Sequence, residues 1–198
     1  FVVEGNSVLP ALAIEQAVYP YLGEKKSIQE VKLASKALEK AYHDAGYLTV
    51  FVDIPEQDIK ENIVRLAVTE GRVERLKVSG ARYYSLGRIK SQTPDLAEGA
   101  VPYFPAVQKQ VAGVNRSADR KVTPVLRPGR APGKVEVELK VADHVPLHGN
   151  LELNNRYSPN TTQTRLSGGV RYDNLWQREH SVSLQFQIAP ERTEDTQV

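Results

Sequence analysis

The C-terminal segment alternates apolar and polar side chains in three successive stretches, residues 147–157, 164–173 and 181–188. In the first stretch, for example, Leu151 points to one face and Glu152 to the other. Each stretch has the length of roughly 10 residues that a tilted strand needs to cross a bilayer, and alternation broken by turn residues is typical of a transmembrane β-barrel. A half-buried strand of a soluble sandwich has the same period, so the alternation alone leaves both architectures open.

The composition narrows the possible functions. With 26 basic and 24 acidic residues the net charge is +2, which gives no support for nucleic-acid binding. The sequence holds no methionine and opens inside an apolar strand pattern, so we expect a signal peptide to have been removed. No apolar run approaches the ~20 residues of a membrane helix, and any contact with a membrane is therefore expected through strands.

Residues 1–71 predict a βααββ module, which we call the first module. A strand at 1–4 is followed by a helix that opens at Pro10. Ser27 and Glu30 form a capping box at the start of a second helix. Two strands with period-two alternation, at 48–54 and 64–68, complete the module.

Residues 72–145 repeat this order and form the second module. Its first strand ends in the triplet 78–80, Val-Ser-Gly, which echoes Val-Glu-Gly at 3–5. A later strand contains Pro124, which marks it as a sheet edge. We therefore expect an α+β fold, with two tandem βααββ modules followed, at 146–198, by the opening strands of an incomplete transmembrane β-barrel.

Several motifs in this order resemble the POTRA domains of the Omp85 superfamily, and more narrowly the outer-membrane transporters of two-partner secretion. That group is the hemolysin secretion and activation family, which includes transporters of contact-dependent inhibition toxins. The motifs are VEGN at 3–6, AYHDAGY at 41–47, VTEGRV at 68–73, VLRPG at 125–129, LNNRYSP at 153–159 and RYDNLWQ at 171–177. A family member would also have an N-terminal plug helix and a barrel of sixteen strands, both outside this sequence.

The resemblance implies a Gram-negative outer-membrane transporter with its POTRA domains in the periplasm. These domains would recognise the N-terminal secretion domain of a large exported partner and pass the unfolded chain to the barrel. An assembly factor for outer-membrane proteins, from the same superfamily, is an alternative, although assembly factors usually carry more than two POTRA domains. A soluble periplasmic scaffold without a barrel is the other alternative.

The alternation at 48–54, which we expect to be exposed beside the helix that carries Leu38 and Tyr42, suggests where the partner binds. In a βααββ module the second strand is expected at a sheet edge, with the strand at 64–68 in the centre. An extended polypeptide can add to such an edge through main-chain hydrogen bonds. We expect an exposed apolar groove there, with outward backbone donors at Thr49 and Phe51. The expected partner-binding residues are Leu38, Tyr42, Leu48, Val50, Val52 and Ile54.

The expected topology follows from placing both modules in the periplasm. The stretch at 147–157 then runs outward, so that 158–161 is an external hairpin and 174–180 a periplasmic turn. Trp176, Tyr157 and Tyr172 are the expected membrane-interface residues, because amphipathic rings favour that boundary. Besides outer-membrane lipid, these open apolar strands need a cover. It could be the rest of a barrel outside this sequence, a second copy of the chain paired edge to edge, or the second module's strand at 135–141, and we favour edge pairing.

No enzyme, cofactor or metal site is expected. His144 and His148 have a spacing that would suit a metal on a helix, but Pro146 lies between them and the segment is predicted to be a linker and a strand. Glu136 and Glu138 are best explained as the solvated face of a strand, because a catalytic pair needs a pocket to raise one pKa.

Overall fold

The computed structural model describes residues 1–23, 26–57, 63–155 and 164–189. The chain divides into two compact parts, residues 1–81 with 86–142, and residues 82–85 with 143–198. Each part is described by itself. No helix in the described ranges is long and apolar enough to cross a membrane.

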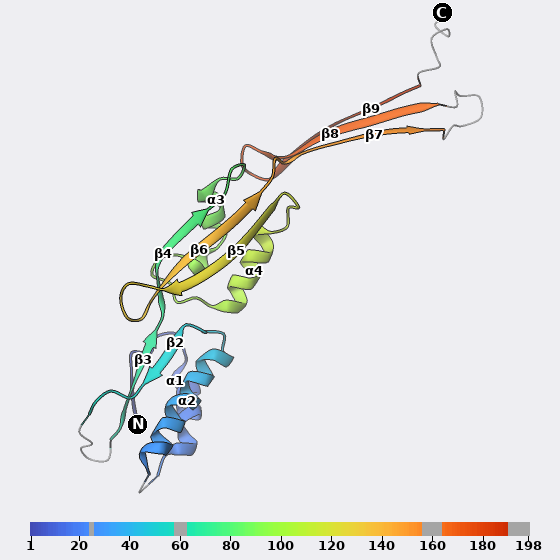
Figure 1. Cartoon of the computed structure of the whole chain (residues 1–198). Helices are drawn as coiled ribbons and strands as arrows, with labels where there is room; N and C mark the ends of the chain where they lie inside the picture. Colours follow the sequence, from blue (N-terminus) through green and yellow to red (C-terminus); the bar gives the residue numbers. More distant parts are fainter. Residues whose placement is uncertain (24–25, 58–62, 156–163, 190–198) are drawn as a thin grey trace, which may run out of the picture. The chain divides into compact units, whose positions relative to one another are not determined.

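The first module has the predicted order of elements (Figure 1). They are β1 (Val2–Glu4), α1 (Ala11–Val18), the 3-10 turn η1 (Tyr19–Tyr21), α2 (Ile28–Asp44), β2 (Val50–Asp53) and β3 (Arg65–Glu70). The predicted capping box is present at the start of α2. The Ser27 amide, together with Lys26, holds the pKa of Glu30 below its usual range. At the other end of α2, Gly46 has a φ of 98°, which suits the residue that follows a helix.

The first sheet has the order β1-β3-β2, with β1 parallel and β2 antiparallel to β3. The prediction that the second strand lies at an edge and that 64–68 is central is confirmed. The apolar faces of α1 and α2 pack with this sheet into one core, in which Leu38, Tyr42, Val50 and Leu66 are fully buried.

The second module repeats this topology (Figure 1). Its elements are β4 (Arg72–Ser79), α3 (Leu86–Ser91), the 3-10 turn η2 (Pro94–Leu96), α4 (Phe104–Val114), β5 (Arg120–Pro128) and β6 (Lys134–Asp143). The strand order is β4-β6-β5, with β4 parallel to the central strand β6. β5, which carries Pro124, lies at the edge, so that prediction is also confirmed.

The two modules meet at the end of α2. The Phe104 amide donates to the Gly46 carbonyl at 3.0 Å, and the rings of Tyr47 and Tyr103 pack with centroids 5.3 Å apart. Gly46 is required here, because a Cβ at this position would lie 2.7 Å from the ring of Pro105. Tyr103 therefore packs between the two modules.

The tail forms a three-stranded antiparallel sheet of β7 (Leu147–Asn154), β8 (Arg165–Leu175) and β9 (His180–Ile188), with β8 in the centre. Its register aligns the apolar faces predicted from alternation, as Leu153 pairs with Leu166 and Leu166 in turn with Ile188. Leu151 and Leu184 on this face are 72% and 74% exposed. The expected hairpin at 158–161 lies outside the described residues.

Candidate partner-binding edge of the first module

The backbone of β2 presents its outward groups at Val50 and Val52. Antiparallel pairing places Phe51 opposite Thr69 and Val52 opposite Val68. Alternate residues of such a strand bond to the neighbouring strand, and the residues between them point away from it. The carbonyl of Val50 and both backbone groups of Val52 bond away from β3, to side chains of α2. The expectation of outward donors at Thr49 and Phe51 is therefore wrong by one residue.

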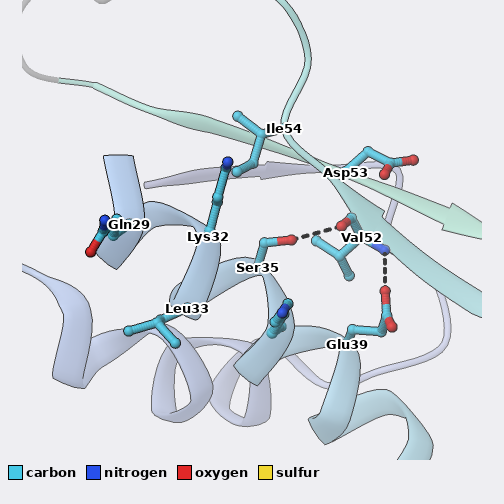
Figure 2. A pocket seen from close by; sticks show the side chains of 9 residues that line it. Gln29, Lys32, Leu33, Ser35, Glu39, Val52, Asp53 and Ile54 are labelled. Atoms are coloured by element: carbon cyan, nitrogen blue, oxygen red, sulfur yellow. Dashed lines mark hydrogen bonds between the residues drawn. The ribbon is translucent and has the colours of Figure 1, made fainter. Parts of the chain in front are cut away.

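Three polar side chains of α2 bond to this edge. The Ser35 hydroxyl donates to the Val52 carbonyl at 2.7 Å, and the Glu39 carboxylate accepts from the Val52 amide at 3.1 Å (Figure 2). The His43 Nε2 lies 3.0 Å from the Val50 carbonyl. The three residues stand four apart, so they lie on one face of the helix. We call them the edge triad.

A groove of about 520 Å³ runs between α2 and β2. Leu33, Val52 and Ile54 give it an apolar lining, and Lys32 and Lys36 add positive charge on the helix side. Figure 2 shows the side chain of Lys32 extending from α2 toward Ile54, which follows β2. An edge strand beside a lined groove can accept an extended peptide, because the backbone supplies hydrogen bonds and the groove supplies selectivity.

Most of the predicted partner-binding side chains lie in the core. Leu38, Tyr42 and Val50 are 0% exposed and Val52 is 5% exposed, so the expected exposed apolar face is wrong for these four. The alternating apolar residues of β2 are buried because they face the helices of their own module. Leu48 is exposed but precedes β2. Val52 and Ile54 are the predicted residues that line the groove.

The sequence prediction missed the edge triad, although a signal was present. Ser35, Glu39 and His43 follow helical spacing directly beside the apolar stripe that contains Leu38 and Tyr42. Such a polar stripe would ordinarily be taken as a solvated face. Ser35 is nonetheless 7% exposed, and burial of a hydroxyl requires a hydrogen-bond partner.

The corresponding edge strand of the second module, β5, has different hydrogen-bond partners. The side-chain amide of Asn115, which follows α4, bonds to both backbone groups of Val122 on β5, at 2.9 Å to the carbonyl and 2.6 Å from the amide. At the other end of β5, the Gly129 amide donates to Lys134, on β6. Alternate residues of β5 from Val122 onward therefore face away from β6, and Pro124 and Pro128 are among them. Neither proline has an N–H that could bond to an added strand.

Comparison with known proteins identifies the first module. The family profile of the ShlB-type POTRA domain matches residues 1–71. The first module is a POTRA domain of the ShlB type. The outer membrane transporter CdiB of Dickeya dadantii (strain 3937) is 24% identical over 156 residues, which cover 79% of this chain and 27% of that protein. The chain thus spans about a quarter of that relative's length.

Solved structures agree on the fold. CdiB from Escherichia coli matches 94% of this chain with a TM-score of 0.77 at 22% identity, using 34% of its own chain. The N-terminal domain of Omp85 from Thermosynechococcus elongatus matches 72% of this chain and 64% of its own, with a TM-score of 0.61 at 22% identity. The family profile and the relatives named CdiB confirm the resemblance to POTRA-containing outer-membrane transporters, and the solved structures agree with it in fold.

A buried carboxylate stabilises the first POTRA domain at the end of β3. Glu70 accepts hydrogen bonds from the amide and hydroxyl of Ser7, from the Val8 amide at 2.9 Å and from Arg72 at 3.1 Å. Burial alone would raise the pKa of Glu70, but these donors outweigh it and hold the pKa below its usual value. Glu70 therefore fixes the loop between β1 and α1.

The predicted membrane-interface residues lie on β8 and in the turn after it. Trp176 is 77% exposed and has a φ of 55°, in a turn where Gln177 and Glu179 also adopt positive φ. Tyr172 lies on β8 and is half-buried, whereas Tyr157 lies outside the described residues. The turn is held by side-chain bonds from Asn174 and Gln177 to the Tyr83 carbonyl, each 3.0 Å long.

The histidines considered as a metal pair do not share a helix. His144 lies in the link between β6 and β7, and His148 lies on β7, as the sequence predicted. The His148 ring instead faces Asp173 on β8, with 3.3 Å between Nε2 and the nearer carboxylate oxygen.

Proposed function

We propose that this chain is the periplasmic part and the opening barrel strands of an outer-membrane transporter in two-partner secretion. The relatives that it matches include outer membrane transporters named CdiB, and its first module is a POTRA domain of the ShlB type. The parts of the proposed transporter are two POTRA domains, at 1–71 and 72–145, and barrel strands from 146 onward. The work of such a protein is transport, without a chemical reaction.

The first POTRA domain captures an extended segment of the exported partner by strand addition at β2. The observation that carries this proposal is the pairing of an edge strand with a groove of about 520 Å³ that leads along its open side. Strand addition recognises backbone first, so it suits a partner that passes through the periplasm unfolded. Nucleotide hydrolysis has no part in this mechanism.

Site-specific photo-crosslinking in the full-length transporter tests the capture site. The exported partner is first identified by comparing culture supernatants of the parent strain and a strain that lacks the transporter. A photoreactive phenylalanine analogue then replaces Leu33, which lines the groove and is 52% exposed. Leu12 on α1, 65% exposed and outside the groove, is the matched control position.

The partner should crosslink at position 33 and not at position 12. Equal yields at the two positions, or no crosslink at position 33 while the partner is still secreted, would show that capture takes place elsewhere.

Assembly of outer-membrane proteins is the second candidate function, because the fold also matches the N-terminal domain of an Omp85 protein. The two functions separate in the deletion strain. Loss of one large protein from the supernatant supports secretion. A general fall in the outer-membrane proteins supports assembly.

A further inference from the structure

The edge that would receive a partner strand is already occupied by side chains of its own domain. A strand that added to β2 would use the carbonyl of Val50 and both backbone groups of Val52. The first accepts from His43, and the other two are bonded to Ser35 and Glu39. One helix face thus supplies the hydrogen bonds that an incoming backbone would supply, with donors and an acceptor in the matching places.

We propose that this edge triad is a latch that a partner segment displaces in order to add to β2. The inference rests on the proposed function and adds that a segment must bind more favourably than the latch before it can pair with β2. A random extended segment gains little, because each backbone bond that it makes replaces one that the latch already made. A cognate segment gains in addition from the apolar groove beside Leu33 and Ile54. Selectivity then comes from the side chains of the segment, which contact the groove. The number of backbone hydrogen bonds made by β2 stays nearly constant, because each new bond replaces a bond to the latch.

The latch residues are placed so that they can leave. Glu39, which lines the groove, and His43 are half-buried, and only Ser35 is buried. A carboxylate or an imidazole that rotates away from the strand edge into solvent is hydrated by water, and a serine hydroxyl can rotate toward a carbonyl of its own helix. Displacement therefore leaves no polar group of the latch buried without a partner.

The second POTRA domain shows what a permanently blocked edge looks like in the same fold. There Asn115 bonds both backbone groups of Val122, and prolines occupy the outward positions 124 and 128. Proline lacks the N–H that an added strand requires, and no side-chain movement restores it. The edge of the first domain carries no proline within β2, so its protection is reversible, and an unprotected edge is a pairing hazard.

The experiment measures the crosslink from position 33 to the exported partner in the full-length transporter, with changes in the latch. Glu39→Ala removes the acceptor for the Val52 amide, and Ser35→Ala removes the donor to the Val52 carbonyl. Glu39→Gln keeps an acceptor oxygen. Lys40→Ala is the matched control, because Lys40 lies on the same helix, is exposed and, in the described part of the chain, pairs only with Asp44.

Glu39→Ala should lower the partner concentration needed for half-maximal crosslinking by about tenfold, which corresponds to one net hydrogen bond of roughly 1.4 kcal/mol. Ser35→Ala should act in the same direction, and Glu39→Gln and Lys40→Ala should remain within about twofold of the parent. Amide hydrogen exchange at Val52 should be faster in Glu39→Ala without partner, and this measures release of the latch directly.

Two outcomes would overturn the latch. If Glu39→Ala weakens crosslinking while Val52 exchanges faster, Glu39 contacts the partner and does not compete with it. If crosslinking is unchanged although Val52 exchanges faster, the partner does not use this edge backbone. Failure of the proposed function has a different signature, because no variant, the parent included, then crosslinks at position 33 while secretion continues; that result overturns both.

Discussion

Replacement of Glu70 by alanine should lower the free energy of unfolding of the first POTRA domain by about 3 to 5 kcal/mol, because it removes the charged acceptor of two backbone amides at a buried position. The carboxylate side chain is only 3% exposed. It accepts from two backbone amides, one hydroxyl and the Arg72 guanidinium. Alanine leaves the amides of Ser7 and Val8 without their acceptor, and hydrogen bonds to charged groups contribute roughly 1.5 to 3 kcal/mol each.

The same contacts predict how stability depends on pH. The folded-state pKa of Glu70 lies below its ordinary value of 4.5. A group with a lowered folded pKa stabilises the folded state above its unfolded pKa, and this stabilisation is lost as the pH falls through the folded pKa. The first POTRA domain should therefore lose stability below about pH 4.5, and Glu70→Ala should lose less over that range because the titrating group is absent.

Native-state hydrogen exchange at Leu66, fully buried in the central strand β3, measures the opening of this domain separately from the tail. Glu70→Gln keeps one acceptor oxygen and should fall between the parent and Glu70→Ala. Glu15→Ala, an exposed change on α1, is the control and should lie within about 0.5 kcal/mol of the parent. A loss below about 1 kcal/mol for Glu70→Ala would refute the reasoning, because the loop would then hold without its acceptor.

Three further predictions concern single positions. Tyr42→Phe should leave stability unchanged or raise it by up to about 1 kcal/mol in thermal unfolding, since the buried hydroxyl has no hydrogen-bond partner among the described residues; a loss above 1 kcal/mol would contradict this. Phe51→Pro should destabilise the first domain more than Val52→Pro, because the Phe51 amide faces β3; the reverse order in urea unfolding would restore the other register. Gly80→Ala should cost about 2 kcal/mol or more in the same assay, because φ is +88° and a Cβ would lie 2.3 Å from the Val141 carbonyl; a neutral result would exclude that strain.

Periodic features of this fold could be predicted from sequence because burial has the period of the backbone. The capping box at Ser27 and the alternation in the tail each report one element and the face that it buries. The repeated glycine is a second kind of signal. Gly5 and Gly80 have φ values of 86° and 88°, and each would place a Cβ 2.3 Å from a carbonyl of the neighbouring central strand. The echo between 3–5 and 78–80 therefore has a steric cause.

The candidate site could be located only in part. Strand order follows from module topology, so the edge position of β2 was predictable. Which backbone groups face outward depends on register, and register is set by the pairing of β2 with β3, not by alternation within β2. The apolar pattern of Val50 and Val52 is the same whether a strand faces its own helices or a partner. For this reason the prediction assigned core residues to the partner.

In both modules, a carboxylate at the end of the central strand holds the loop that follows the first strand. In the first module a carboxylate that ends the central strand accepts from the amides of Ser7 and Val8. In the second, Asp143 ends the central strand and accepts from the amides of residues 82, 83 and 84, at 2.8 to 3.2 Å.

That second loop has a further set of bonds. The Tyr83 carbonyl accepts from Asn174 and Gln177, and the Ser85 amide donates to Gln177 at 2.9 Å. The same carboxylate arrangement thus has two roles. In the first module it holds the loop between β1 and α1. In the second it shapes a loop whose remaining backbone groups bond to the turn between β8 and β9. Because a clamped loop has already lost its conformational freedom, the turn bonds to it at a smaller entropic cost than to a free segment.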